Sequence, residues 1–252
     1  MTVTPRLHWF RSALKVGVAL CIGAASASAA IPNAEKIADA VAETNRLSGR
    51  SVPVLLEVTL RIGDGEPVAT GVLASHPTGL ARLELQSRRG FVERHLLQGN
   101  SYTASRDGQL LKRPHPFLPP TFFLQAESGA AFRAALASYG VASGEVALGR
   151  VADRDCYVFG GRLPRGAEGE ERMLPSVWVD METYQIVQID RPGGVRFRFG
   201  PMKAFEEIQA PSWIEVVAPD QPDARLDVVR VVPANAPAAA FGMDWLTALA
   251  NP

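Results

Sequence analysis

Cysteine is scarce in this sequence, with only Cys21 and Cys156 among 252 residues. Two cysteines are too few for the dense disulfide framework of a small secreted scaffold. Cys156 lies in a segment with strand character, Asp155 to Phe159, with no histidine beside it and no helix N-terminus to lower its pKa. We therefore interpret Cys156 as a buried, unreactive thiol and not as a nucleophile.

Histidine is also scarce, and the common catalytic motifs are absent. His76, His95 and His115 are the histidines after residue 30, and none has the His-Glu-x-x-His spacing of a metal site. Each fits a surface position on a strand or loop, and a three-histidine site assembled across strands is the less favoured alternative. No Gly-x-Ser-x-Gly sequence occurs, which excludes an α/β-hydrolase. We expect no metal, no cofactor and no catalytic residue, and hence a protein that is not an enzyme.

The sequence also lacks an apolar run long enough to cross a bilayer. The uncharged stretch from Val16 to Ala24 is much shorter than the roughly 18 to 20 residues that a spanning helix needs. Three basic residues precede it, and the small-residue run Ala25–Ala30 follows it. This order is typical of a cleaved secretory signal peptide, so we predict a signal peptide over residues 1–30 and a periplasmic mature protein. A lipid-modified Cys21 is disfavoured, because Leu20 stands where a lipobox has a small residue.

There is no excess of basic charge. The 26 Lys and Arg residues balance the 26 Asp and Glu residues, and removal of Arg6, Arg11 and Lys15 with the signal peptide leaves 23 − 26 = −3. A chain without a basic surplus has nothing to neutralise a phosphate backbone. We therefore expect no nucleic-acid partner.

The period of the apolar residues changes from helical to alternating near residue 50. Ala34, Ile37, Ala38 and Val41 have helical spacing after Asn33, a fair N-cap. From Val52 to Ile62, apolar and polar residues alternate, and Gly63–Gly65 predicts a turn into a strand over 67–75. Further strands are expected over these ranges: 81–86, 91–97, 101–113 with a turn at 106–108, 145–151, 156–162, 176–180, 185–190, 195–199, 212–217 and 225–232.

Two segments interrupt or end this series of strands. Pro114–Leu124 cannot be a central strand, because its prolines lack ladder donors. It leads into a helix that Ser128 caps and Gly140 ends. Pro164–Leu174 is expected to be an exposed loop, and a third amphipathic segment carries Phe241, Trp245 and Leu249 at helical spacing.

These elements predict a mainly β (α+β) fold. About ten strands in one domain must curl, so residues 31–252 are expected to form a single half-open β-barrel of antiparallel strands. The three helices need an apolar face to pack on, and we expect all three to plug its concave side. The space between the plug and the sheet is the natural site for a small apolar ligand.

Several segments resemble a known family. The N-terminal helix, the Gly63-Asp-Gly65 hairpin and the strand that ends before His76-Pro77 are similar to the opening of the LolA and LolB lipoprotein carriers. Ser176–Ile189, with its Val-Trp-Val-Asp strand and Glu-Thr turn, resembles a hairpin of that family, and Ala210–Glu215 resembles a strand of the broader lipoprotein-sorting group. The resemblance covers most of residues 33–235.

The resemblance implies a carrier that shelters the acyl chains of a lipoprotein, or another lipid, on the way to the outer membrane. It also implies an inner-membrane release complex and an outer-membrane receptor as partners. His76 stands where the carriers have an arginine that helps to close the cavity, so it is the gating candidate. The expected ligand-binding residues are Leu56, Val58, Leu60, Leu83, Phe117, Phe122, Phe123, Trp178, Phe197 and Trp213.

Two other function classes remain open, a regulatory sensor and, less favoured for lack of a catalytic constellation, an enzyme. A regulatory sensor of the RseB type uses a similar half-barrel to bind lipid or a membrane protein partner. Phe117, Phe122 and Phe123 could form a lid that a lipid chain displaces, or could simply dock into the core.

Overall fold

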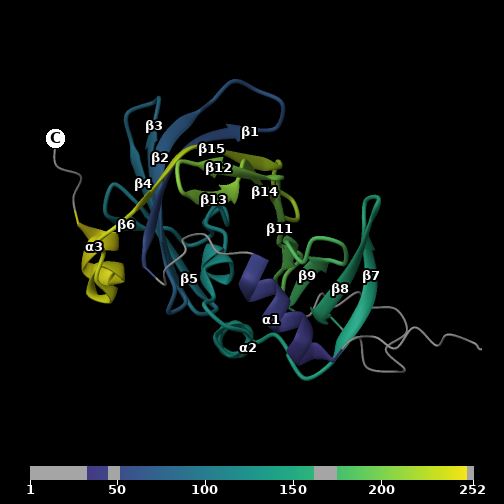
Figure 1. The fold of residues 1–252 in the computed structure, drawn as a ribbon. Coiled ribbons are helices and arrows are strands. Elements are labelled where there is room, and N and C mark those ends of the chain that lie inside the picture. The colour runs from purple at the N-terminus through teal and green to yellow at the C-terminus, as the bar shows by residue number, and fades with distance from the viewer. Residues whose placement is uncertain (1–32, 45–51, 162–174, 249–252) are drawn as a thin grey trace, which may run out of the picture. The chain divides into compact units, whose positions relative to one another are not determined.

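A thirteen-stranded antiparallel sheet dominates the computed structural model (Figure 1). The structure describes residues 33–44, 52–161 and 175–248. The predicted signal peptide and the loop predicted over 164–174 therefore lie outside the described residues, and both stay predictions.

The sheet is built as two series of strands joined by the last strand of the chain. The first series is β1 (Val54–Ile62), β2 (Ala69–His76), β3 (Leu80–Ser87), β4 (Val92–Gln98), β5 (Ser101–Arg106) and β6 (Gln109–Leu110). The second is β7 (Val146–Val151), β8 (Arg154–Gly160), β9 (Ser176–Asp180), β10 (Ile186–Asp190), β11 (Arg196–Phe199) and β14 (Trp213–Val217). The strand β15 (Ala224–Pro233) pairs with both β1 and β14, so β6 and β7 form the two edges and the curled sheet stays open.

Alternation decides which side chains face the core. Leu56, Val58 and Leu60 are at most 3% exposed, whereas Glu57 between them is exposed. The same rule holds in β3, where Leu83 and Leu85 are buried. We call the face that carries the large apolar cluster the inner face and the opposite one the outer face. The predicted half-open barrel is confirmed.

Two helices cover the inner face, as predicted. Helix α1 (Ala34–Thr44) buries Ile37 and Val41, and helix α2 (Gly129–Ser138) buries Phe132 and Leu136 in the same cluster. The Ser128 side chain accepts a hydrogen bond from the Ala131 amide and so caps α2. The two helices approach closely at Gly129, where a Cβ would lie 2.0 Å from the Asp39 carboxylate.

The third helix is on the other side of the sheet, and the expectation that it plugs the inner face is wrong. The 3-10 turn η2 (Ala238–Phe241) and the helix α3 (Met243–Thr247) lie against the outer face of the first series (Figure 1). Phe241 and Leu246 form a separate cluster with Ala74 and Leu96. The reason is that β2 and β4 carry apolar residues on both faces near this point, which gives the C-terminal segment an apolar patch of its own.

One hairpin was not predicted. The strands β12 (Met202–Phe205) and β13 (Ile208–Pro211) lie between β11 and β14 in the sequence, and they form a separate two-stranded sheet. Ile208 and Ala210 join the inner cluster. The turn places Glu206 at φ +54°, in the left-handed region, without the glycine or asparagine that normally marks such a turn. That missing signal explains why the sequence did not reveal the hairpin.

Candidate functional site

A cleft of about 600 Å³ opens at one end of the inner face. Its walls come from the end of β1, the loop that leads into β2, the turn between β3 and β4, and Phe117. Leu60, Leu85 and Phe117 belong to the inner cluster, so the cleft opens directly onto the apolar core. Its volume lies within the range of about 300 to 1,000 Å³ that is usual for small-ligand sites.

A group of polar side chains forms one wall of the cleft. Glu93 of β4 is 5% exposed and faces Arg106 of β5, whose guanidinium lies 2.9 Å from the carboxylate. The Arg106 guanidinium also stacks over the Phe91 ring, 4.4 Å from its centre. The cleft therefore combines an apolar floor with a fixed charged pair.

His95 extends this polar group into the core. The prediction that His95 lies at the surface is therefore wrong. Its side chain is fully buried, because alternation in β4 turns His95 inward with Glu93. Its Nδ1 lies 2.8 Å from the Tyr102 hydroxyl, which in turn donates to the carbonyl of His115. Its Nε2 lies 3.1 Å from the Glu93 carboxylate, at ion-pair distance, but is not aligned for a hydrogen bond.

The charge state of Glu93 follows from these neighbours. Burial by itself would raise the pKa of Glu93, but the nearby His95 and Arg106 more than offset this and hold the pKa below its usual value. Burial raises the pKa of the Tyr102 hydroxyl. The wall therefore presents an ionised carboxylate, and the phenol of Tyr102, which bonds to His95, is neutral.

A turn of two arginines stands at the mouth of the cleft. Arg88 and Arg89 are exposed and line the cleft together with Glu66. The turn itself is fixed, because the Gly90 amide donates to the Ser87 carbonyl and the Arg88 amide donates to the Val68 carbonyl. Sequence reasoning missed these arginines. The strand that ends at Ser87 and the glycine at 90 were the available signal.

The residues predicted to bind ligand fall into three groups. Leu60 and Phe117 line the cleft itself. The next group lies deeper in the inner cluster and comprises Leu56, Val58, Leu83, Phe122, Phe123 and Phe197. The third group, Trp178 and Trp213, lies on the outer face. The ligand-binding role of the first two groups stays a prediction.

The aromatic segment that could act as a lid is packed into the core. Phe122 and Phe123 lie in the 3-10 helix η1 (Thr121–Gln125) and are at most 1% exposed. Their rings contact each other at 4.7 Å and both contact Tyr139. Hydrogen bonds tie the segment to the sheet near both of its ends, from the Tyr102 hydroxyl to the His115 carbonyl at 2.9 Å and from Ser75 Oγ to Gln125 Oε1 at 2.6 Å.

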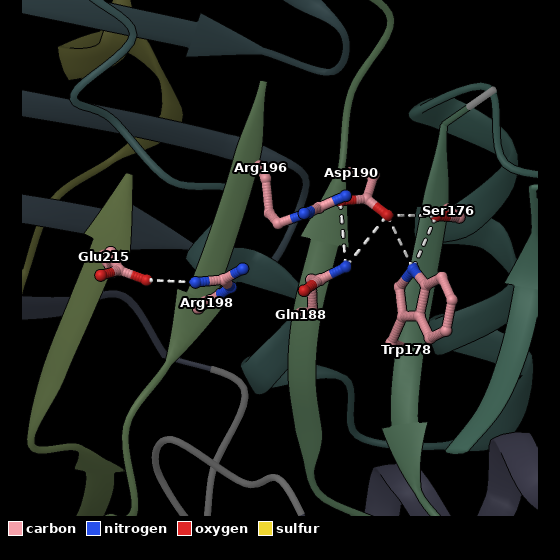
Figure 2. Close-up of polar contacts among 7 residues, drawn as sticks. All are labelled: Ser176, Trp178, Gln188, Asp190, Arg196, Arg198 and Glu215. Atoms are coloured by element: carbon pink, nitrogen blue, oxygen red, sulfur yellow. Dashed lines mark hydrogen bonds and ion pairs between the residues drawn. The ribbon is translucent and has the colours of Figure 1, made fainter. Parts of the chain in front are cut away.

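Trp178 is part of a polar network on the outer face of β9, β10 and β11 (Figure 2). Its neighbours Val177 and Val179 point into the inner cluster, so alternation turns the indole outward. The indole N–H donates to the Asp190 carboxylate at 2.8 Å and to Ser176 Oγ at 2.9 Å. The expected position of Trp178 against an inner-face ligand is therefore wrong.

Trp213 also faces outward, for the same reason. Ile214 takes the inner position next to it, and the Trp213 ring stacks under the Arg225 guanidinium at 4.8 Å. A Cβ at Gly200 would lie 2.6 Å from this ring, so the glycine makes room for it. Trp213 is a packing residue of the outer face.

His76 contacts the C-terminal segment. Its ring meets Phe241 edge-on at 5.7 Å, and its Nδ1 lies 2.7 Å from the Thr78 hydroxyl. Partial burial lowers its pKa. Ser75, one residue earlier, faces inward to Gln125. The contacts of His76 are thus on the outer face, and its predicted gating role gains no support from them.

Other predicted features can be placed briefly. Cys156 is free and buried, and burial raises its pKa, as expected for an unreactive thiol. Within residues 33–44, 52–161 and 175–248, no group of three or more His, Cys, Asp or Glu side chains is arranged to hold a metal ion. None of the helices in this described part of the chain is long and apolar enough to cross a membrane.

Comparison with known proteins gives structural neighbours only. No protein-family model matches the chain, and no curated protein matches it. A LolA superfamily protein from Nitrosomonas europaea is similar at a TM-score of 0.50 and 12% identity, over 86% of this chain and 100% of that one. An outer membrane lipoprotein-sorting protein domain from Vibrio parahaemolyticus is similar at a TM-score of 0.50 and 11% identity, over the same shares.

At these identities the similarity concerns the fold, and it agrees with the resemblance that the sequence segments carry. The open antiparallel sheet and the helices on its inner face are the architecture that this resemblance predicts. The chain therefore has the fold of the LolA superfamily.

Proposed function

We propose that the protein is a periplasmic carrier that holds an acyl chain of a lipoprotein, or another lipid, during transfer to the outer membrane. The observation that carries the proposal is the cleft of about 600 Å³ that opens onto the apolar core. Residues 1–30 act as the export signal in this proposal. The two structural neighbours supply the fold, and the name of one of them refers to lipoprotein sorting.

The walls of the cleft suit a hydrocarbon chain. Leu60, Leu85 and Phe117 form its floor, and Val68, which is 39% exposed, stands at its entrance. Burial of an alkyl chain gains about 0.8 kcal/mol for each methylene. An affinity that rises with chain length is the expected signature of such a site.

In this proposal, movement of the segment from Pro114 to Leu124 lengthens the cleft. Its prolines keep it out of the strand ladder, and Phe117 belongs to both this segment and the cleft wall. Movement of the segment would bring Phe122 and Phe123 into contact with a longer chain. This lid action is part of the proposal.

The test is the affinity for fluorescent fatty acyl probes of increasing chain length, with two matched variants. Val68→Asn adds a polar group to the cleft, whereas Val72→Asn changes a valine of similar exposure (42%) that does not line it. We expect binding to strengthen with each added methylene, and Val68→Asn to weaken it about threefold or more. Val72→Asn should have no effect. A folded protein whose affinity does not depend on chain length would contradict the carrier function.

A further inference from the structure

Two arginines at the mouth of the cleft have no partner in the described structure. Arg88 and Arg89 are exposed and line the cleft, and neither side chain forms an ion pair or hydrogen bond with a residue that the structure describes. Their backbone is nevertheless fixed. The Arg88 amide bonds to the Val68 carbonyl at 3.0 Å, and the Arg89 amide bonds to Ser87 Oγ at 3.1 Å.

The charges around the cleft leave these two arginines available. Five charged side chains line it, three arginines and two glutamates, so the sum is 3 − 2 = +1. Arg106 and Glu93 form a pair at 2.9 Å and offset each other. Glu66 then remains at the mouth against Arg88 and Arg89. The mouth is therefore cationic, while the floor below it is apolar.

We propose that the cleft selects acyl chains with an anionic headgroup, and that Arg88 and Arg89 bind this headgroup. This proposal rests on the proposed function, because it assumes that the chain occupies the cleft. The arrangement matches the two halves of an amphiphile. The guanidinium groups are fork-shaped donors that fit phosphate or carboxylate oxygens, and they line the same cleft as the apolar Leu60 and Leu85.

The experiment compares three amphiphiles with the same palmitoyl chain, each below its micellar concentration. They are the anionic lysophosphatidylglycerol, the zwitterionic lysophosphatidylcholine and the neutral monopalmitoylglycerol. Isothermal titration should give about tenfold tighter binding of the anionic lipid than of the neutral one. In Arg88→Gln/Arg89→Gln the ratio should fall to near one. High salt should reduce the ratio as well, because the headgroup pair is exposed to solvent.

The adjacent basic pair Lys112 and Arg113 provides the control. Both residues are exposed and neither lines the cleft. Lys112→Gln/Arg113→Gln removes the same charge, so it should keep the tenfold ratio. A ratio that falls equally in both variants would point to the net charge of the protein and overturn the proposal.

The outcomes separate this proposal from the proposed function. If the neutral lipid binds but the anionic one binds no more tightly, the headgroup proposal fails and the carrier function stands. If no amphiphile binds, both fail. Displacement of the bound anionic lipid by millimolar inorganic phosphate would indicate a plain anion site. Cosedimentation with phosphatidylglycerol vesicles without lipid extraction would indicate a membrane surface. Either result would overturn the proposal.

Discussion

Two buried carboxylates lie in opposite halves of the sheet, and their surroundings differ. Asp190, on the outer face of β10, is 3% exposed. It accepts hydrogen bonds from Ser176 Oγ, Trp178 Nε1, Gln188 Nε2 and Arg196 Nε, at 2.8 to 3.2 Å (Figure 2). This network joins β9, β10 and β11 with every carboxylate oxygen used.

The surroundings of Glu93, on the inner face of β4, are less complete. Its carboxylate is 5% exposed and contacts Arg106 and His95. The His95 Nε2 is not aligned for a hydrogen bond, and among the described residues the His115 Nδ1 has no hydrogen-bond partner. Buried polar atoms without partners are costly, and native proteins keep few of them.

We interpret the difference as that between a polar cluster that serves the fold and one that belongs to the proposed site. A fully satisfied network such as that of Asp190 makes the strands rigid and leaves nothing for a ligand to complete. A partly satisfied cluster that opens into a cleft is the kind of local inconsistency that proteins retain at functional sites. The cleft end of the inner face is therefore the candidate site.

The largest expected loss of unfolding free energy comes from placing a carboxylate where it has no hydrogen-bond donor. Leu56→Asp places one on the inner face among apolar side chains, at a residue that is 0% exposed. Loss of the buried leucine and burial of an unpaired charge should cost at least about 4 kcal/mol of unfolding free energy. Glu57→Lys, at the exposed neighbour that pairs with Arg230, should cost less than about 1 kcal/mol. Equal small effects in urea unfolding would contradict the assignment of the two faces.

Much of the fold could be predicted because alternation is a local signal. The faces of β1 and β3 follow directly from the order of Leu56 to Leu60 and of Leu83 to Leu85. The position of α3 could not be predicted in this way. Its apolar stripe shows that it packs on something, but the outer patch around Leu96 arises only when β2 and β4 both pair with β3.

The site was predicted only in part, for a similar reason. Apolar residues such as Leu60 and Phe117 were found because a cleft floor has the same composition as a core. His95 was predicted to lie at the surface and Glu93 was not singled out, since polar residues in alternating strands usually face solvent. Their burial depends on Tyr102 and Arg106 across the β4–β5 pair, and these contacts are not visible in a single strand.

Removal of the Asp190 carboxylate tests the fully hydrogen-bonded network around it. Asp190→Ala removes the acceptor that Arg196 Nε and three neutral donors share, in a place where Asp190 is 3% exposed. Removal of one partner from a buried ion pair costs about 3 to 5 kcal/mol, and the 31% exposure of the Arg196 side chain puts this pair at the lower end of that range. The matched change is Glu215→Gln, since the Arg198–Glu215 pair on the same face is 42% and 30% exposed, and it should cost less than about 1 kcal/mol. If Asp190→Ala unfolds no more easily than Glu215→Gln in urea, the network does not hold the strands together.

The smallest expected effect is the contribution of Glu93 to the pH dependence of the unfolding free energy. Because its neighbours hold its pKa below the usual 4.5, the unfolded chain binds this proton more readily than the folded one. The carboxylate therefore stabilises the fold above about pH 4.5, and this contribution is lost as the pH falls through the lower pKa of the folded state. Glu93→Gln lacks the contribution at every pH, so its deficit in unfolding free energy should be largest near pH 7 and should close under acid. Arg106→Gln removes one of the groups that lower the pKa, so the folded-state pKa moves toward the unfolded one, and acid should destabilise the variant over a narrower pH range, and by less, than it does the wild type. Urea unfolding at a series of pH values measures both effects, and a Glu93→Gln deficit that stays constant from pH 7 to 3 would contradict an ionised Glu93 in the wall of the cleft.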